Sequence, residues 1–312
     1  MGETSLKIIA SCRGSQKQVD FGIPKIIATF IWVQLISIIM IAFFLPERIF
    51  LRPVAKLFGV RYQKSYEWLY GSLMKLALWG PKAIYGMKVD FDSDALPKSD
   101  IPLILPNHPH SLYTGSLAAY LVNWLNLVQK GRVVCINRIA LYPFFGNMLW
   151  ATRHLFVKNG EVNLSEAGPS NSEAQPILIY CDGYDANITK FRQYSDDFCR
   201  EQDIPPFHWV LHPKTRGFHK LMTRYRTRFT HVYEVTYIFP DGPLNRFWNA
   251  IFHPPTKFVF EIKRTPIEDL PHGKEELKNW IVNSFREKDA ILKSYYGPYQ
   301  QEDEKLEKRS NS

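Results

Sequence analysis

An uninterrupted apolar run near the N-terminus constrains this chain more than any other feature of its sequence. Residues 26–45 (IIATFIWVQLISIIMIAFFL) contain no charged side chain, and they lie between Lys25 and the pair Glu47-Arg48. A helix of about 20 apolar residues is long enough to cross the hydrocarbon core of a bilayer. A cleaved signal sequence has a shorter apolar region followed by small residues, which this segment lacks. We therefore predict a single transmembrane helix at 26–45 after a polar tail at 1–20; a buried helix of a soluble protein is the alternative.

The regions that flank this helix do not determine its orientation. Basic residues precede it and follow it, whereas the positive-inside rule requires a clear excess on one side. The next segment, at 60–86, has leucines at helical spacing and tryptophans of the kind found at membrane interfaces. It is predicted to be an amphipathic, membrane-associated helix region. A helix that packs against the protein core is the alternative.

Beyond residue 88 the hydrophobic pattern changes to short apolar strands that alternate with helices, which is typical of an α/β layer fold. The predicted strands are 101–105, 132–136, 154–157, 177–181, 232–239 and 257–263. The predicted helices are 116–129, 190–202, 215–225 and 274–295. We expect one domain at 88–298, built as a central sheet flanked by helices, and then a charged, solvated tail at 299–312.

The net charge of +9, from 39 basic and 30 acidic residues, favours an anionic partner such as a lipid surface or a phosphorylated substrate. We expect no nucleic-acid partner, because the chain has a predicted membrane helix and no nucleic-acid-binding motif. The four cysteines form no CxxC pair and no metal-ligand spacing, so neither a disulfide scaffold nor a metal site is predicted.

Asn107 and His108 follow the strand at 101–105, which ends at Pro106, and they precede a predicted helix. A turn between a strand and a helix holds a side chain rigidly and leaves it open to a ligand. The ordinary pKa of a histidine lies near neutrality, which suits a general base, although a lone histidine can also simply cap or pack. Two other predicted strands end in acidic turns, Asp182-Gly183-Tyr184-Asp185 and Pro240-Asp241-Gly242. Ligands gather at the carboxyl ends of strands in open α/β sheets, so these turns are candidate parts of a site too. An Asp-Gly pair that only forms a turn is the alternative for each of them.

These residues resemble the motifs of the glycerolipid acyltransferase family, most closely the branch of lysophosphatidic acid and lysocardiolipin acyltransferases. Asn107-His108 match the start of the first motif, and the segment from Cys181 to Asp185 is similar to the third. The second motif is resembled by Pro143, Gly146, Phe156 and Lys158. Further similarity at 208–218, 262–267 and 286–296 extends the resemblance over most of the predicted domain.

The resemblance implies the fold of the glycerolipid acyltransferases, with a central sheet flanked by helices, and it implies a reaction. An acyl group would move from acyl-CoA to a hydroxyl of a lysophospholipid, with His108 as general base and Asn107 as a second catalytic residue. The implied substrate-binding residues are Asp182, Gly183, Pro143, Gly146 and Lys158. No metal or tightly bound cofactor is implied, because acyl-CoA is a co-substrate. The family resemblance also implies residence in the endoplasmic reticulum membrane, with membrane lipids as partners. The basic run from Lys214 to Arg228 is predicted to face anionic lipid or the CoA phosphates, or to be a solvated charged surface.

The chain departs from the family pattern at positions that matter for catalysis. The first motif has an aspartate five residues after its histidine, and Tyr113 stands there instead. The threonine and arginine of the third motif are replaced by Tyr184 and Asp185, and a basic residue of the second is replaced by Ile136. A phenol is neutral at pH 7, so it can accept a hydrogen bond from an imidazole but cannot stabilise an imidazolium as a carboxylate does. Two hypotheses follow: either Asp182 or Asp185 serves His108 in an active enzyme, or the domain is a catalytically weak or dead protein that binds lipid or acyl-CoA.

Overall fold

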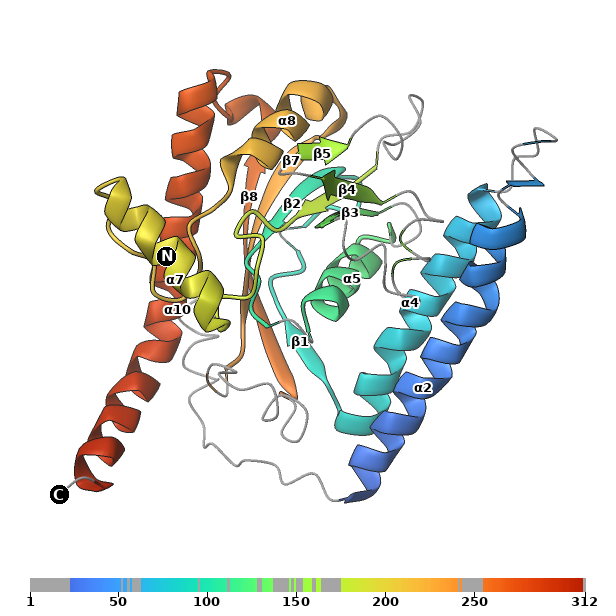
Figure 1. Ribbon diagram of the computed structural model, residues 1–312, viewed down its shortest axis with the longest axis horizontal. Coiled ribbons are helices and arrows are strands. Elements are labelled where there is room, and N and C mark those ends of the chain that lie inside the picture. Colours follow the sequence, from blue (N-terminus) through green and yellow to red (C-terminus); the bar gives the residue numbers. More distant parts are fainter. Residues whose placement is uncertain are drawn as a thin grey trace.

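The computed structural model describes residues 23–51, 53–54, 57, 63–94, 96–110, 113–127, 131–136, 146, 149, 154–158, 161–163, 175–240, 242 and 255–310. Within these residues, eight strands form one sheet in the order β1-β8-β7-β2-β6-β3-β4-β5 (Figure 1). The strands are β1 (Lys88–Asp90), β2 (Pro102–Pro106), β3 (Arg132–Ile136), β4 (Leu155–Lys158), β5 (Glu161–Asn163), β6 (Ile177–Ile179), β7 (His231–Ile238) and β8 (Lys257–Pro266). All neighbouring pairs are parallel except β4–β5 and β7–β8. The six predicted strands are confirmed, and the short strands β1 and β5 are additional.

The central strand β2 is apolar because both faces of the sheet are covered. All five of its residues are buried. Leu103 and Leu105 belong to one hydrophobic core, and Ile104 between them belongs to the other. Successive side chains of a strand point to opposite faces, so an unbroken apolar run is what a strand between two helical layers requires. The predicted α/β fold with a central sheet between helices is therefore confirmed.

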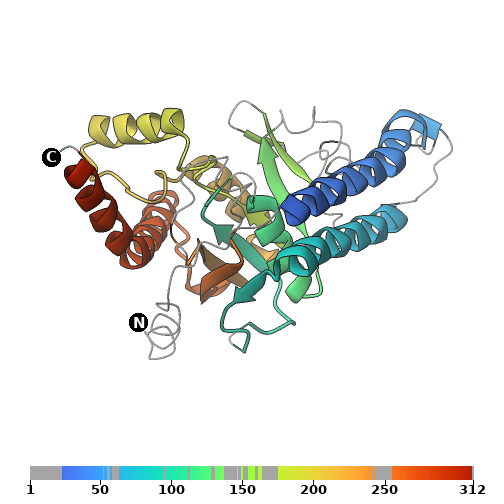
Figure 2. The same ribbon diagram turned by 90° about the horizontal axis from the view of Figure 1, so that it is seen from below.

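Helices cover the two faces of the sheet in separate groups (Figures 1 and 2). One group consists of α2 (Ile23–Pro46), α4 (Gln63–Tyr85) and α5 (Thr114–Trp124). The other consists of α7 (Thr189–Glu201), α8 (Thr215–Tyr225) and α10 (Lys274–Ser310), and three short turns named η1 (Glu47–Leu51), η3 (Arg226–Arg228) and η4 (Ile267–Asp269) complete the helical segments. Helix α8 has the predicted bounds. Helix α10 continues to Ser310, so most of the predicted tail at 299–312 extends this helix.

Helices α2 and α4 lie side by side along one flank of the molecule (Figures 1 and 2). The hydroxyls of Thr29 and Tyr85 share a hydrogen bond, and the rings of Trp32 and Trp79 lie 5.3 Å apart. The Trp32 side chain of α2 approaches the α4 backbone closely at Gly80, where an added Cβ would lie 2.0 Å from Nε1 of Trp32. A glycine at this position is what allows the indole to lie across α4.

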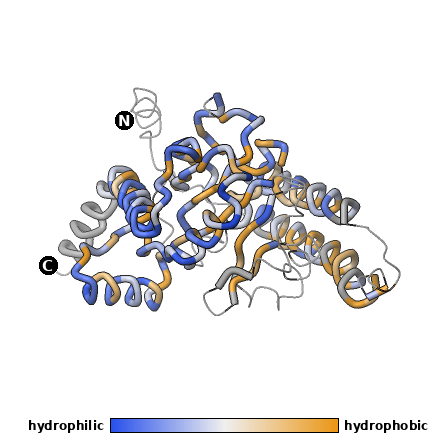
Figure 3. Tube along the Cα trace, turned by 90° about the horizontal axis from the view of Figure 1, so that it is seen from above, coloured by the Kyte–Doolittle hydropathy of each residue, from blue (hydrophilic) through white to orange (hydrophobic). Residues whose placement is uncertain are grey.

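The outer surface of this helix pair is apolar. The segment Ile27–Leu51 has a mean hydropathy of 2.4 and is, among the described residues, the one helix long and apolar enough to cross a membrane. Only 12% of its apolar window is buried, and Figure 3 shows α2 as a mostly hydrophobic helix. The predicted helix at 26–45 therefore exists, and its passage through a membrane stays a prediction. On α4, Trp68 and Trp79 are exposed while Leu73 and Met74 lie in the core, so the membrane association predicted for 60–86 also stays a prediction.

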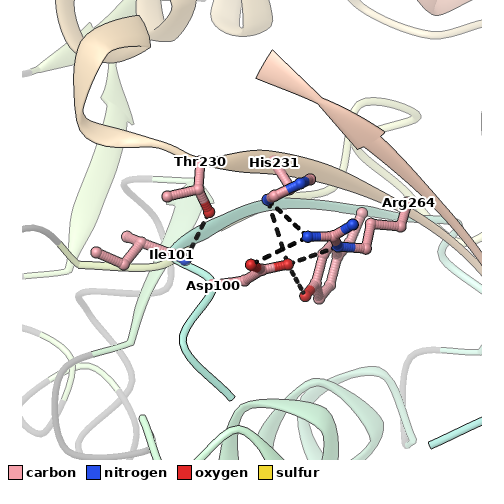
Figure 4. Close-up of polar contacts among 6 residues, drawn as sticks. Asp100, Ile101, Thr230, His231 and Arg264 are labelled. Atoms are coloured by element: carbon pink, nitrogen blue, oxygen red, sulfur yellow. Dashed lines mark hydrogen bonds and ion pairs between the residues drawn. The ribbon is translucent and has the colours of Figure 1, made fainter. Parts of the chain in front are cut away.

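A polar cluster ties β2, β7 and β8 together at the amino end of β2 (Figure 4). Oδ2 of Asp100 accepts hydrogen bonds from the Tyr233 hydroxyl and from Nε of Arg264, each at 2.7 Å. Nδ1 of His231 lies 3.2 Å from the same oxygen. Burial opposes ionisation of Asp100, but the hydrogen bonds from Arg264 and Tyr233 lower its pKa below the ordinary value of an aspartate. This cluster lies at the end of β2 opposite to the strand end that leads to His108.

Candidate active site

The parallel strands β2 and β6 bring His108 and Asp182 together. Leu103 pairs with Ile177 in the sheet, so the chain segments after both strands leave the same edge. The main-chain N–H of His108 donates a hydrogen bond to Oδ2 of Asp182 at 2.7 Å. Asp182 is almost fully buried. This contact joins the first and third predicted motifs, and it holds the backbone of the histidine rather than its ring.

Asn107 fixes the residue before the histidine. Its Nδ2 donates to the carbonyl oxygen of Tyr237 at 3.3 Å, and its Oδ1 accepts the N–H of Tyr237 at 2.7 Å. The amide side chain thus continues the pairing of β2 with β7 beyond the last strand residue. Because its oxygen and nitrogen both bond to main chain, Asn107 acts on His108 through the backbone.

The imidazole of His108 is held by Thr114, which sequence reasoning missed. Nδ1 of His108 lies 3.1 Å from Oγ1 of Thr114, the first residue of α5. The same Oγ1 donates a hydrogen bond to the carbonyl oxygen of His110 at 2.8 Å. The ring of Tyr180 lies 5.0 Å from the imidazole, and its hydroxyl donates to the carbonyl oxygen of Thr114 at 2.9 Å. The available signal was a hydroxyl residue directly after Tyr113, close to the predicted start of the helix.

Tyr113, at the position of the family's aspartate, packs among aromatic rings. Its ring centroid lies 5.8 Å from that of Phe258 and 6.0 Å from those of Phe239 and His110. Burial raises the pKa of this phenol far above its ordinary value, so it is neutral throughout the physiological range. The side chain at this position contributes packing and no charge.

Burial dominates the electrostatics of the site. It lowers the pKa of His108 to about 4, an effect that His110 reinforces and that the negative charge of Asp185 opposes. It also raises the pKa of Asp182 to about 7, against hydrogen bonds from main-chain N–H groups and the positive charge of Lys288. Lys288 is itself buried, which lowers its pKa to about 8, and its Nζ donates to the carbonyl oxygen of Val235. At pH 7 the imidazole of His108 is therefore neutral and able to accept a proton.

Lys214, the residue directly before α8, lies next to Gly183 in the turn after β6. Nζ of Lys214 lies 4.0 Å from the centroid of the Tyr184 ring, and this ring stacks on Phe191 at 3.8 Å. Gly183 has a φ of +74°, and an added Cβ would lie 3.0 Å from Nζ of Lys214. Both the positive φ and the nearby lysine side chain favour glycine at this position. In the part of the chain that the structure describes, no carboxylate lies within ion-pair distance of this ammonium group.

Two loops of the site are tied to each other by side chains of the third motif region. Oδ1 of Asp185 accepts the N–H of Asn187 at 2.9 Å. The amide of Asn187 in turn donates to the carbonyl oxygen of Pro109 at 2.8 Å. Asp185, one of the two acids considered as a substitute for the missing aspartate, thus lies close enough to influence both His108 and His110 electrostatically.

Helix α10 secures the loop that leads to Lys214. The carboxylate of Asp289 accepts the main-chain N–H groups of His208, Trp209 and Val210 at 2.6–3.2 Å. Arg286 donates to the carbonyl oxygen of Pro206 at 2.8 Å, and its guanidinium lies 3.6 Å from the centroid of the Phe207 ring. These contacts give a physical role to the family-like sequence at 286–296.

The other predicted site residues lie farther away or outside the described chain. Lys158 is the last residue of β4, which is separated from β2 by β6 and β3 and so lies roughly 14 Å away across the sheet. Gly146 is buried. Pro143 lies outside the described residues. Within the basic run, Arg226 donates to carbonyl oxygens of Ile267 and Pro271, so at least this member stabilises the fold.

The sequence is similar to known acyltransferases along most of its length. Residues 251–311 match the family model described as Acyltransferase C-terminus. A probable 1-acyl-sn-glycerol-3-phosphate acyltransferase 5 from Arabidopsis thaliana is 25% identical over 276 residues, which are 83% of this chain and 71% of that protein. Lysocardiolipin acyltransferase 1 from Mus musculus is 23% identical over 254 residues, which are 74% of this chain and 65% of that protein.

Among solved structures, the 1-acyl-sn-glycerophosphate (LPA) acyltransferase from Thermotoga maritima aligns over 84% of this chain and 98% of its own, with 13% identity and a TM-score of 0.42. The sequence matches run through the strand ends and the C-terminal helix that build the site described above. The distant homologues of this chain are therefore glycerolipid acyltransferases of the 1-acyl-sn-glycerol-3-phosphate and lysocardiolipin types.

Proposed function

We propose that this protein transfers an acyl group from acyl-CoA to a hydroxyl of a lysophospholipid, with His108 as general base. The observation that carries the proposal is the setting of the His108 imidazole at the joint carboxyl end of β2 and β6. Its Nδ1 contacts Thr114, and among the described residues Nε2 has no hydrogen-bond partner. A neutral imidazole with one restrained nitrogen and one available nitrogen is suited to accept a proton from an alcohol.

In the proposed reaction, the acceptor hydroxyl loses its proton to Nε2 of His108 while its oxygen attacks the thioester carbonyl of acyl-CoA. A tetrahedral intermediate forms and collapses, the carbon–sulfur bond breaks, and the CoA thiolate takes the proton back from the imidazolium. The negative charge of Asp185 favours the imidazolium electrostatically. Asp182 and Asn107 contribute by holding the main chain at His108 and at the residue before it.

The lysine above Gly183 is the proposed contact for the acceptor's phosphate. Lys214 is positioned by Tyr184, and no carboxylate of the described chain pairs with it. An ammonium group that is not held in an ion pair can attract an anionic headgroup. Because Gly183 has no side chain, the Lys214 side chain can lie directly next to it. Gly146, Pro143 and Lys158 are proposed to bind the remaining parts of the substrates, on the strength of the family resemblance.

The apolar helix α2 is proposed to anchor the protein in the endoplasmic reticulum membrane, where a lysophospholipid acceptor is available in the same bilayer. Full-length protein that resists extraction from microsomes by alkaline carbonate would support the anchor. Complete release into the soluble fraction would contradict it.

The test of the proposed function is acyl transfer by purified full-length protein in detergent micelles or vesicles. Radiolabelled acyl-CoA is offered with a panel of lysophospholipids, and His108→Ala is assayed alongside. We expect transfer by the wild type and a loss of at least about 10²-fold in the variant, the contribution usual for a general base. Equal thermal unfolding of the two proteins would show that the fold survives. Full activity of His108→Ala would remove this residue from the mechanism.

A lipid-binding or acyl-CoA-binding protein without catalytic activity is the second candidate. Two observations favour it: a phenol occupies the position of the catalytic aspartate, and the pKa of His108 is lowered to about 4, which makes the imidazole a weak base. Saturable binding of acyl-CoA with no transfer to any acceptor would support this alternative. Turnover that depends on His108 would exclude it.

A further inference from the structure

The hydroxyl of Thr114 contacts two groups, but it has a single proton to donate. Oγ1 lies 2.8 Å from the carbonyl oxygen of His110 and 3.1 Å from Nδ1 of His108. A carbonyl oxygen can only accept a hydrogen bond, so the shorter contact requires the threonine proton. If that proton pointed at Nδ1 instead, lone pairs of Oγ1 and the carbonyl oxygen would face each other at 2.8 Å.

The other contact must then run in the opposite direction. Oγ1 accepts a hydrogen bond from Nδ1, and Nδ1 must carry the ring's proton. A neutral imidazole has one N–H, so Nε2 is left with its lone pair. From this geometry we infer that Thr114 is the positioning residue that selects the Nδ1–H tautomer of His108. It would thus take over the orienting role that a carboxylate has in the family. This inference rests on the proposed role of His108 as general base.

The arrangement suits a proton acceptor throughout the reaction. When Nε2 takes a proton, Nδ1 keeps the hydrogen that it already shares with Oγ1, so neither side chain has to rotate. A serine protease achieves the same restraint with a buried aspartate, which also stabilises the imidazolium by its charge. Threonine supplies the orientation alone. The charge in this site comes from Asp185, which the structure places within electrostatic range of His108.

Thr114 is well restrained for such a role. Its N–H donates to the carbonyl oxygen of His110 at 3.1 Å, and its own carbonyl oxygen accepts the Tyr180 hydroxyl at 2.9 Å. Its side chain is buried, and the Tyr180 ring packs on the imidazole. Branching at Cβ further limits the rotation of a threonine side chain. The hydroxyl is thus fixed by contacts on both sides of the first turn of α5.

The experiment compares Thr114→Val, which keeps the shape and removes the hydroxyl, with Thr114→Ser, which keeps the hydroxyl. Full-length protein with ¹⁵N-labelled histidine reports the protonation of each ring nitrogen by its chemical shift. The His108 signals are identified by their loss in His108→Gln. At pH 7 we expect a protonated Nδ1 and an unprotonated Nε2 in the wild type and in Thr114→Ser. In Thr114→Val we expect a mixture of tautomers and a kcat lower by about 10- to 10²-fold, well short of the roughly 10⁴-fold loss that follows disruption of a catalytic triad carboxylate.

Two results would overturn the inference. One is a wild-type His108 whose Nδ1 is unprotonated, and this result does not depend on how any Thr114 variant folds. The other is a folded Thr114→Val protein with an unchanged tautomer and kcat, or a Thr114→Ser protein as impaired as Thr114→Val. Failure of the proposed function has a different signature. In that case the tautomer follows the hydroxyl as expected, while the wild type transfers no acyl group.

Discussion

Oδ2 of Asp182 accepts the main-chain N–H of His108 at 2.7 Å. Asp182 therefore restrains the loop that carries His108 and does not bond to the imidazole ring. This relationship separates two roles that one carboxylate can have next to a catalytic histidine. A charge partner of the imidazole must be ionised, whereas an acceptor for a main-chain N–H can be neutral.

Replacement of Asp182 tests which role it has. Asp182→Asn keeps an oxygen acceptor for the His108 N–H, so we expect kcat to fall less than about 10-fold. Asp182→Ala leaves this N–H without its acceptor, which should cost about 1–3 kcal/mol of stability and a larger part of the activity. Transfer assays and thermal unfolding of both variants provide the measurement. A loss of several orders of magnitude in Asp182→Asn, with an unchanged fold, would instead assign Asp182 a charge role.

Replacement of Lys214 tests the proposed phosphate contact. Lys214→Ala should raise the KM for an acceptor that carries a phosphate monoester and change kcat little, because an interaction equal in ground and transition states affects binding. Lys214→Arg should keep part of the affinity. The matched control is Lys190→Ala, since Lys190 also lies over a tyrosine ring, that of Tyr194 on α7. Equal KM values for Lys214→Ala and Lys190→Ala would contradict a role of Lys214 in acceptor binding.

Replacement of Tyr113 by aspartate tests whether the absence of the family's carboxylate limits the rate of acyl transfer. Tyr113 packs against Phe239 and Phe258, so an aspartate would place a carboxylate among aromatic rings. We expect Tyr113→Asp to lower the unfolding temperature and to leave kcat no higher than in the wild type, because Thr114 already occupies Nδ1 of His108. The conservative control is Tyr113→Phe, which should keep both properties. A gain in kcat in Tyr113→Asp would show that the missing carboxylate limits the rate.

The Asp100 cluster predicts how stability depends on pH. The pKa of Asp100 is lowered in the folded protein, so its stabilising contribution is complete above the unfolded-state pKa, near about 4, and is lost as the pH falls through the folded-state pKa. Asp100→Asn should therefore be less stable than the wild type by about 1–3 kcal/mol at pH 7, with a smaller difference below about pH 4. Denaturant unfolding at both pH values provides the measurement. Asp197→Asn, which breaks an exposed ion pair with Arg200, should have little effect at either pH, and an equal effect of the two variants would refute the prediction.

Gly80 predicts how α2 and α4 pack. A Cβ at this position would overlap the indole of Trp32, so Gly80→Ala should weaken the contact between the helices and lower resistance to proteolysis. The double variant Gly80→Ala with Trp32→Ala should recover part of that resistance, since the overlapping group is removed. Additive losses in the double variant would mean that the two residues do not interact.

The sequence was sufficient to predict those features of the fold that depend on a local pattern of residues. The strand Arg132–Ile136 has the predicted bounds because it is a short apolar run, and the helix Thr215–Tyr225 has them because its apolar residues recur at helical spacing. The turn after β2 was predictable from the sequence because Pro106 ends the strand directly before Asn107 and His108. The three-residue strands β1 and β5 were missed, since three residues are too few to establish a period.

The tertiary structure decided which side chains meet. Tyr113 and Thr114 are adjacent in the sequence, and only the packing of α5 against the sheet determines that the tyrosine faces an aromatic cluster and the threonine faces His108. Asp182 was predicted as a site residue, but its bond to a main-chain N–H depends on the pairing of β2 with β6. The sequence by itself was enough to predict the apolar helix near the N-terminus, the alternation of strands and helices and the turn that carries His108, because these follow from short-range periodicity and motif spacing. Partners between distant segments depend on how the elements dock, a property that no local pattern encodes.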